Sequence, residues 1–154
     1  MNADKDLIQD RIDIVETLAR YVRDVDDHEV EKVADLFTAT GALQIHTRTG
    51  RQPHQKLGEA FVGREGLREL AKSWPRERVA MHRTSDHIVR IDGDGAELSA
   101  RFIVVDLTDD RRIEGSGISA YTVQLGGQYE ATLLKADGEW RFTRLDIRIS
   151  GPLG

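Results

Sequence analysis

The five histidines are the side chains best suited to chemistry near neutral pH, because imidazole gains and loses a proton there. Their spacing does not suit a metal site. His82 and His87 are an odd number of residues apart, so on one regular strand they point to opposite faces. His28, His46 and His54 fall in or near predicted loops and form no ligand spacing. We therefore expect no metal and no cofactor.

Composition excludes several further kinds of chemistry. The chain has no cysteine, which rules out disulfides, thiolate metal sites and a cysteine nucleophile. It contains no HExxH, P-loop, GxGxxG or GxSxG motif, and Gly93-Asp94-Gly95 is typical of a turn and not of a phosphate loop. The net charge of −5 argues against a nucleic-acid partner, which would require a basic surface.

The first half of the sequence has the spacing of helices. The chain has 154 residues, which favours one domain over residues 1–154 with a core over about 5–149. Apolar residues three and four apart predict a helix over about 4–24 and a shorter one near 30–37. A third helix begins at Gly63 and ends at Pro75. Short strands are predicted over about 42–45 and 57–62, with a loop over 47–55 between them.

The second half alternates in the manner of strands. Strands are predicted over 81–91, from Leu98 to Val104, over 118–134 and over 139–149, with Asp92-Gly93-Asp94-Gly95 as a hairpin turn and 109–112 as a polar loop. In the last strand Trp140 and Phe142 share one parity, whereas Leu145 and Ile147 share the other. This switch predicts a β-bulge near Thr143-Arg144. The fold class is therefore α+β, with helices covering one face of a curved antiparallel or mixed sheet.

Several segments in this order resemble the SnoaL-like branch of the nuclear-transport-factor-two-like (NTF2-like) superfamily. The segments are Val25-Asp26 before 33–37, Phe61-Val62-Gly63-Arg64-Glu65-Gly66-Leu67, Met81-His82-Arg83-Thr84, Gly127-Gln128-Tyr129, and Asp137-Gly138-Glu139-Trp140-Arg141-Phe142. The resemblance implies a cone-shaped sheet closed by three helices around an apolar cavity. Its members include scytalone dehydratase, a dehydrochlorinase, polyketide cyclases and the small subunits of ring-hydroxylating dioxygenases, so the fold alone does not fix the function.

The resemblance also implies a catalytic pair. In the dehydratase and dehydrochlorinase members, an aspartate after the first helix holds a histidine on the strand that follows the third helix. Asp26 and His82 occupy the matching positions. An aspartate at this place has a second interpretation, because Asp26 with Glu29 also fits the N-terminal capping box of the second helix.

Further side chains are candidates for contact with substrate. Tyr21 and Tyr129 could donate a phenol hydrogen bond, although each could instead be a packing residue, the interpretation that is favoured for Tyr21. Arg144 lies by the predicted bulge, where an arginine could turn inward, although a solvated arginine is the simpler interpretation. Phe61, Trp74, Phe102 and Tyr121 are candidates for the cavity wall.

These residues support a principal hypothesis and two alternatives. The first is a cofactor-independent lyase, isomerase or cyclase in which His82 removes a proton from an apolar cyclic or polyketide-like substrate. The alternative is a non-catalytic ligand-binding or accessory module of the same fold. A weaker one is an epoxide hydrolase, for which Asp106 and Arg101 are the available pair, although their odd offset separates them.

The expected setting is the cytoplasm. The start of the chain is charged from residue 4 onward and has no apolar signal-peptide core, and no segment approaches the ~20 apolar residues of a membrane span. Ile103 and Val105 are predicted on the outer face of the sheet, where apolar side chains require a cover. We therefore expect a homodimer, with a trimer as the alternative.

Overall fold

The structure is a computed structural model that describes residues 3–112 and 119–151. It contains three helices and seven strands, which follow one another in the order α1 (Ala3–Asp26), α2 (Val30–Asp35), β1 (Phe37–Arg48), β2 (Gln55–Lys56), β3 (Phe61–Val62), α3 (Gly63–Lys72), β4 (Ala80–Asp92), β5 (Gly95–Arg112), β6 (Ser119–Ala136) and β7 (Glu139–Ser150). The predicted α+β class and the switch from helices to strands near the middle of the chain are confirmed.

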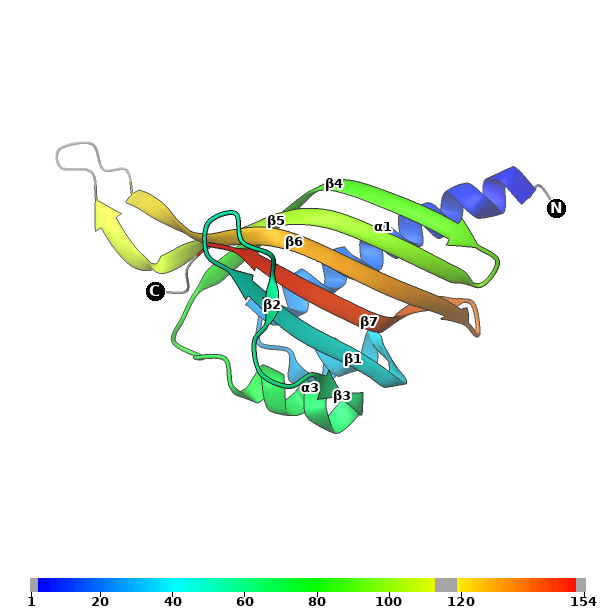
Figure 1. Cartoon of the computed structure of the whole chain (residues 1–154), viewed down its shortest axis with the longest axis horizontal. Helices are drawn as coiled ribbons and strands as arrows, with labels where there is room; N and C mark the ends of the chain where they lie inside the picture. Colours follow the sequence, from blue (N-terminus) through cyan, green and yellow to red (C-terminus); the bar gives the residue numbers. More distant parts are fainter. Residues whose placement is uncertain (1–2, 113–118, 152–154) are drawn as a thin grey trace.

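The strands form one open, mixed sheet. Its order is β2-β1-β7-β6-β5-β4, and β3 pairs with β1. All described pairings are antiparallel except β1 with β7, which is parallel. The three helices lie on one side of the twisted sheet, with α1 running behind it (Figure 1). The core therefore lies between this concave side and the helices.

Helix α1 buries only its C-terminal half. Ile14, Leu18, Tyr21 and Val22 repeat at helical spacing, and at most 6% of each residue's surface is exposed. Near the N-terminus of α1 the predicted apolar stripe is not buried, since Leu7, Ile8 and Ile12 are between 43% and 60% exposed. The buried half carries the end of α1, with Asp26, to β4.

Two β-bulges interrupt the regular pairing of the sheet. Thr132 pairs with Arg144 and Leu133 pairs with Phe142, so Thr143 is the extra residue of the predicted bulge. The bulge places both Phe142 and Leu145 in the core despite their opposite parity. A second bulge lies in β4 between Ser85 and Ile88, where Asp86 has a φ of 53°.

Some element boundaries differ from the predicted ones. Helix α1 continues to Asp26, so the connection to α2 is only three residues long. Most of the predicted strand over 57–62 is wrong, because only Phe61–Val62 pairs with β1. The predicted polar loop over 109–112 is also wrong, since Arg111 and Arg112 continue β5 by pairing with Ala120 and Ser119 of β6.

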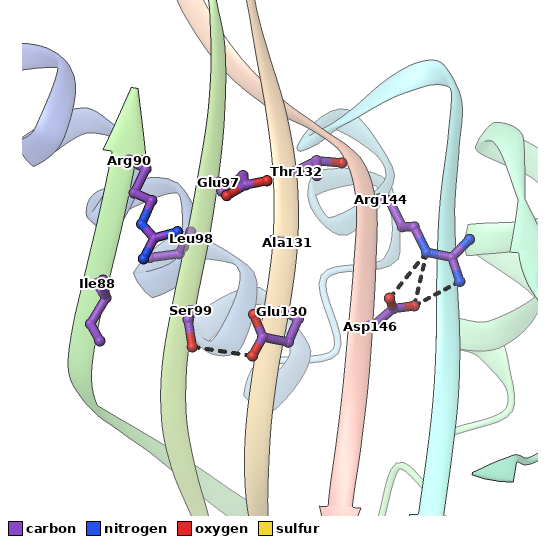
Figure 2. Close-up of a pocket in the computed structure, with 10 residues that line it drawn as sticks. All are labelled: Ile88, Arg90, Glu97, Leu98, Ser99, Glu130, Ala131, Thr132, Arg144 and Asp146. Carbon is purple, nitrogen blue, oxygen red and sulfur yellow. Dashed lines mark hydrogen bonds and ion pairs between the residues drawn. The ribbon is translucent and has the colours of Figure 1, made fainter. Parts of the chain in front are cut away.

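The outer face of the sheet carries mainly polar side chains. Figure 2 shows this face with the helices behind the strands, around a shallow hollow of about 410 Å³. Ser99 donates a hydrogen bond to Glu130, and Arg144 pairs with Asp146 at 2.9 Å. Ile88 on β4 is an apolar exception and is 61% exposed.

Candidate active site

His82 and Asp26 form a bonded pair at the end of α1. Asp26 is the last residue of α1, and His82 is the third residue of β4. The Nδ1 atom of His82 lies 2.6 Å from Oδ1 of Asp26, and the backbone N–H of His82 donates to Oδ2 at 2.8 Å. Only 17% of the His82 side chain and 16% of the Asp26 side chain is exposed. Both carboxylate oxygens therefore hold the same residue.

This geometry excludes the interpretation of Asp26 as a helix cap. Helix α2 begins after Glu29, which makes no side-chain capping bond. Asp26 instead lies at the C-terminal end of α1, where the helix dipole disfavours a carboxylate. The two hydrogen bonds from His82 offset that cost.

The pair fixes which nitrogen of the imidazole can act as a base. An ionised carboxylate only accepts hydrogen bonds, so Nδ1 carries the hydrogen and Nε2 carries the lone pair. Among the described residues, Nε2 of His82 has no hydrogen-bond partner. Strand pairing places His82 opposite Val104, a cavity residue, so the ring is on the concave side of the sheet.

The ring lies against an apolar cavity of about 180 Å³. Its wall comes from α1, the connection between α1 and α2, α3, the segment that follows α3, and five strands. The lining residues are Tyr21, Val25, Asp26, His28, Ile45, Leu70, Trp74, Pro75, Arg78, Ala80, His82, Phe102, Val104, Leu125, Tyr129, Ile147 and Ile149. The volume is close to the ~150 Å³ of a protein cavity that holds benzene. It suits a molecule with a single ring.

Two tyrosines give this apolar wall its hydroxyl groups. Tyr21 and Tyr129 are at most 2% exposed, and their ring centroids are 6.1 Å apart in an edge-to-face arrangement. Phe102 stacks on Tyr129 at 4.4 Å. Neither hydroxyl has a hydrogen-bond partner among the described residues, although both side chains line the cavity.

Burial keeps both phenols protonated. It raises the pKa of Tyr21 and raises the pKa of Tyr129 well above its usual value, with further contributions at Tyr129 from Tyr21 and Asp26. A phenol that stays neutral is a hydrogen-bond donor at every physiological pH. The site therefore combines a base with two donors.

The structure brings together six of the nine predicted site residues. Asp26, His82, Tyr21, Trp74, Phe102 and Tyr129 line one cavity. Phe61, Tyr121 and Arg144 do not line it. Phe61 pairs with β1 and packs on the edge of the core, and Tyr121 is 54% exposed on β6.

Arg144 is placed by the bulge on the side away from the cavity. It immediately follows the extra residue Thr143, and its side chain pairs with Asp146 on the outer face (Figure 2). The prediction of Arg144 as an inward, substrate-binding side chain is therefore wrong, and the structure shows the simpler alternative, an arginine that is 44% exposed. The bulge restores Leu145 to the core face, so the residue before it must point outward.

The remaining histidines do not gather around a metal. His87 lies in the β4 bulge, and its Nε2 is 3.0 Å from the hydroxyl of Thr84. Because of this bulge, β4 is not a regular strand between His82 and His87, so an odd spacing does not decide which faces they lie on. The two histidines still have different hydrogen-bond partners, Asp26 for His82 and Thr84 for His87. Among the residues described, no group of three or more His, Cys, Asp or Glu side chains could hold a metal ion.

Two polar lining residues were missed in the sequence. His28 lies in the short connection between α1 and α2, with a φ of 56°, and Arg78 lies between α3 and β4. Both fall in polar, irregular segments, where the periodicity of apolar residues gives no information on direction. Only the tertiary arrangement places them at the cavity.

The comparisons with known proteins agree with the fold. Residues 6–146 match the model of the SnoaL-like domain family. The chain belongs to this family. The fold is that of NTF2-like proteins. No curated protein matches the chain.

Solved structures extend the likeness along the whole chain. The D26N variant of Rv3472 from Mycobacterium tuberculosis, a protein of unknown function, is 26% identical with a TM-score of 0.77, over 97% of this chain and 76% of that one. A putative scytalone dehydratase from Novosphingobium aromaticivorans is 19% identical, with a TM-score of 0.63 over 96% and 88% of the two chains. A hexachlorocyclohexane dehydrochlorinase, LinA-type3 from Novosphingobium barchaimii, is 16% identical, with a TM-score of 0.69 over 96% and 90%.

Proposed function

We propose that this SnoaL-like protein is a cofactor-independent enzyme of the lyase, isomerase or cyclase kind. His82 takes a carbon-bound proton from a small, largely apolar ring, and Asp26 orients the imidazole. The observation that carries the proposal is the 2.6 Å contact between Nδ1 of His82 and Oδ1 of Asp26 at an apolar cavity. Dehydratase and dehydrochlorinase relatives of the same fold support the class of reaction.

The chemistry follows from where charge develops. When Nε2 of His82 takes a proton, positive charge forms on the ring, next to the carboxylate of Asp26 and the negative end of the α1 dipole. The electron pair left on carbon moves to an activating group such as a carbonyl. Tyr21 and Tyr129 are the hydroxyl donors available to stabilise the resulting oxyanion. Elimination, isomerisation and ring closure share this first step.

Exchange of carbon-bound hydrogen for deuterium tests that step without knowledge of the natural substrate. The protein is incubated in D₂O with cyclohexanone, and loss of the α-proton signal is followed by NMR. We expect exchange by the wild type, with rates lower by about 10²–10⁴-fold in His82→Gln, the usual contribution of a general base. Asp26→Asn should lose at least about tenfold, because its side chain no longer holds the imidazole in one tautomer as a carboxylate does.

The chain offers a matched control for each substitution. Asp27→Asn removes a neighbouring exposed carboxylate, and His87→Gln removes an exposed histidine of the same strand. Both should keep the wild-type exchange rate. Exchange that is the same in His82→Gln as in the wild type would refute His82 as the base. Binding of the ketone without any exchange would favour the alternative function, a non-catalytic ligand-binding module.

The epoxide-hydrolase alternative has no support in the placement of its residues. Arg101 is exposed and lies 3.8 Å from Asp86. The Asp106 carboxylate accepts a hydrogen bond from the backbone N–H of Thr108, and neither Arg101 nor Asp106 lines the cavity.

A further inference from the structure

Arg78 is a cationic side chain in the wall of an otherwise mostly apolar cavity. It is half-buried, and its Nε atom is buried without a hydrogen-bond partner. A buried donor without a partner costs free energy. The terminal nitrogens of Arg78 are not buried and make no hydrogen bond to the described residues, so they are the donors that a ligand in the cavity can reach.

The backbone around Arg78 is held in place from several sides. The N–H of Arg78 donates to the carbonyl of Pro75 at 3.3 Å, and the carbonyl of Arg78 lies 3.4 Å from Nε2 of His28. The next residue, Val79, donates from its N–H to the hydroxyl of Thr108 at 2.7 Å and accepts at its carbonyl from the N–H of Leu107 at 2.8 Å. These hydrogen bonds hold the backbone from which the Arg78 side chain extends, in the connection between α3 and β4 (Figure 1).

The guanidinium of Arg78 forms no ion pair with a carboxylate among the described residues. Asp26 is bonded twice to His82. Asp106 accepts from Thr108 and Gln124, and its pKa is lowered mainly by Thr108 and only in smaller part by the charge of Arg78.

We propose that Arg78 is a specificity-determining residue that binds an acidic oxygen, such as a carboxylate, on the substrate ring. The proposal rests on the function proposed above and adds a substrate class to it. The guanidinium presents several N–H donors in one plane, a geometry that matches a carboxylate. A carboxylate on the ligand adds negative charge to a cavity whose wall already contains the carboxyl group of Asp26, and Arg78 is the cationic side chain in the described lining that can pair with it.

Paired ligands of equal shape test this inference. The probes are cyclohexanecarboxylate and cyclohexanecarboxamide, and their dissociation constants are measured by NMR titration at pH 7.5. We expect the wild type to bind the carboxylate at least about tenfold more tightly than the amide. In Arg78→Gln the two constants should agree within about twofold, with the amide affinity unchanged, which shows that the cavity is intact. Arg83→Gln, an exposed arginine on β4, is the matched control and should keep the wild-type ratio.

Three results would overturn the inference. One is a wild-type ratio near one, and another is no detectable binding of the carboxylate at millimolar concentration. The third is a carboxylate preference that survives Arg78→Gln but is lost in His82→Gln, which would assign anion binding to the imidazole. Because the ratio is measured without turnover, its failure is distinct from a failure of the deuterium-exchange experiment. Either experiment can fail while the other succeeds.

Discussion

At the scale of single residues, the two ring nitrogens of His82 have different surroundings. Nδ1 is bonded to Asp26, and Nε2 is left as the acceptor. Family resemblance paired Asp26 with His82 and expected Asp26 just after the first helix, whereas the residues alone left the capping role of Asp26 open. What decided between the two was the length of α1, which ends at Asp26 and not two residues earlier. Helix ends are the least well predicted part of a helix.

The two cavity tyrosines give a prediction that separates function from stability. Their hydroxyls have no hydrogen-bond partner among the described residues, so Tyr21→Phe and Tyr129→Phe remove no bond within the fold. We expect the free energy of unfolding in urea to change by less than about 0.5 kcal/mol in each variant. Deuterium exchange on cyclohexanone should fall by about 10-fold or more in at least one of them. A loss of 2 kcal/mol, on the order of a buried bond, would show that the hydroxyls are structural.

At the scale of elements, two β-bulges shape the sheet, and only one of them could be predicted from the sequence. The Thr143 bulge could be predicted, because it interrupts an apolar alternation that must stay on one face. The Ser85–Ile88 bulge could not, since the surrounding residues are polar and exposed on either face. Similarly, the position of Arg78 depends on how β5 holds Val79, a contact that no local pattern encodes.

Gly127 lies where the backbones of the paired strands β6 and β7 approach closely. A Cβ atom at Gly127 would lie 2.0 Å from the carbonyl oxygen of Arg148, so one strand must move to accept any side chain. We expect Gly127→Ala to lower the free energy of urea unfolding by about 2 kcal/mol or more, the usual range for overpacking. Gly95→Ala, whose added Cβ would lie 3.5 Å from the nearest atom, is the control and should change stability by less than about 1 kcal/mol. Equal effects of the two substitutions would disprove the close approach.

Asp10 connects α1 to the β6–β7 hairpin and makes stability depend on pH. Its carboxylate accepts from Lys135 at 2.7 Å and from the indole of Trp140 at 3.0 Å, and its side chain is 15% exposed. The hydrogen bond from Lys135, followed by that from Trp140, lowers the pKa of Asp10 below its usual 3.8, against the effect of burial. Ionised Asp10 therefore stabilises the fold above pH 3.8, and this contribution is lost as the pH falls through the lower, folded-state pKa.

A substitution isolates this contribution. At pH 7, Asp10→Asn should destabilise the protein by about 1–2 kcal/mol in urea unfolding. The difference from the wild type should shrink as the pH falls below 3.8, because protonation removes the same charge. Glu16→Gln, which breaks an exposed pair with Arg20, should cost less than about 0.5 kcal/mol at any pH. A deficit of Asp10→Asn that is constant down to pH 2 would contradict the assignment.

At the scale of the whole molecule, the outer face of the sheet is the surface that we expect a second copy to cover. Ile88 and Ile103 on this face are 61% and 44% exposed. The described helices lie on the other side of the sheet (Figure 1). Toward β1 and β7 the same sheet carries His46, Arg48 and Arg148, each with a buried ring or guanidinium nitrogen that lacks a partner. Glu97 and Glu130 lie toward β5 and β6. A two-fold axis can place Arg48 and Arg148 against these glutamates.

Light scattering after size exclusion tests this arrangement. We expect the wild type to elute with twice the chain mass of 17.3 kDa and Ile103→Lys to shift toward the single-chain mass, since a lysine in an apolar interface is costly. Ile8→Lys changes an isoleucine on α1 that is 60% exposed, against 44% for Ile103, and should remain dimeric. A monomeric or trimeric wild type would argue against a two-fold dimer.

The helices described include none long and apolar enough to cross a membrane.

The tautomer of His82 is the most direct measurement of the central claim. A long-range ¹H–¹⁵N NMR spectrum, recorded at a pH where the imidazole is neutral, shows which ring nitrogen carries the hydrogen. We predict a protonated Nδ1 and an unprotonated Nε2 in the wild type, and loss of this preference in Asp26→Ala with no change in Asp27→Ala. A wild-type ring protonated at Nε2 would present a donor to the cavity, and His82 could not then be the base.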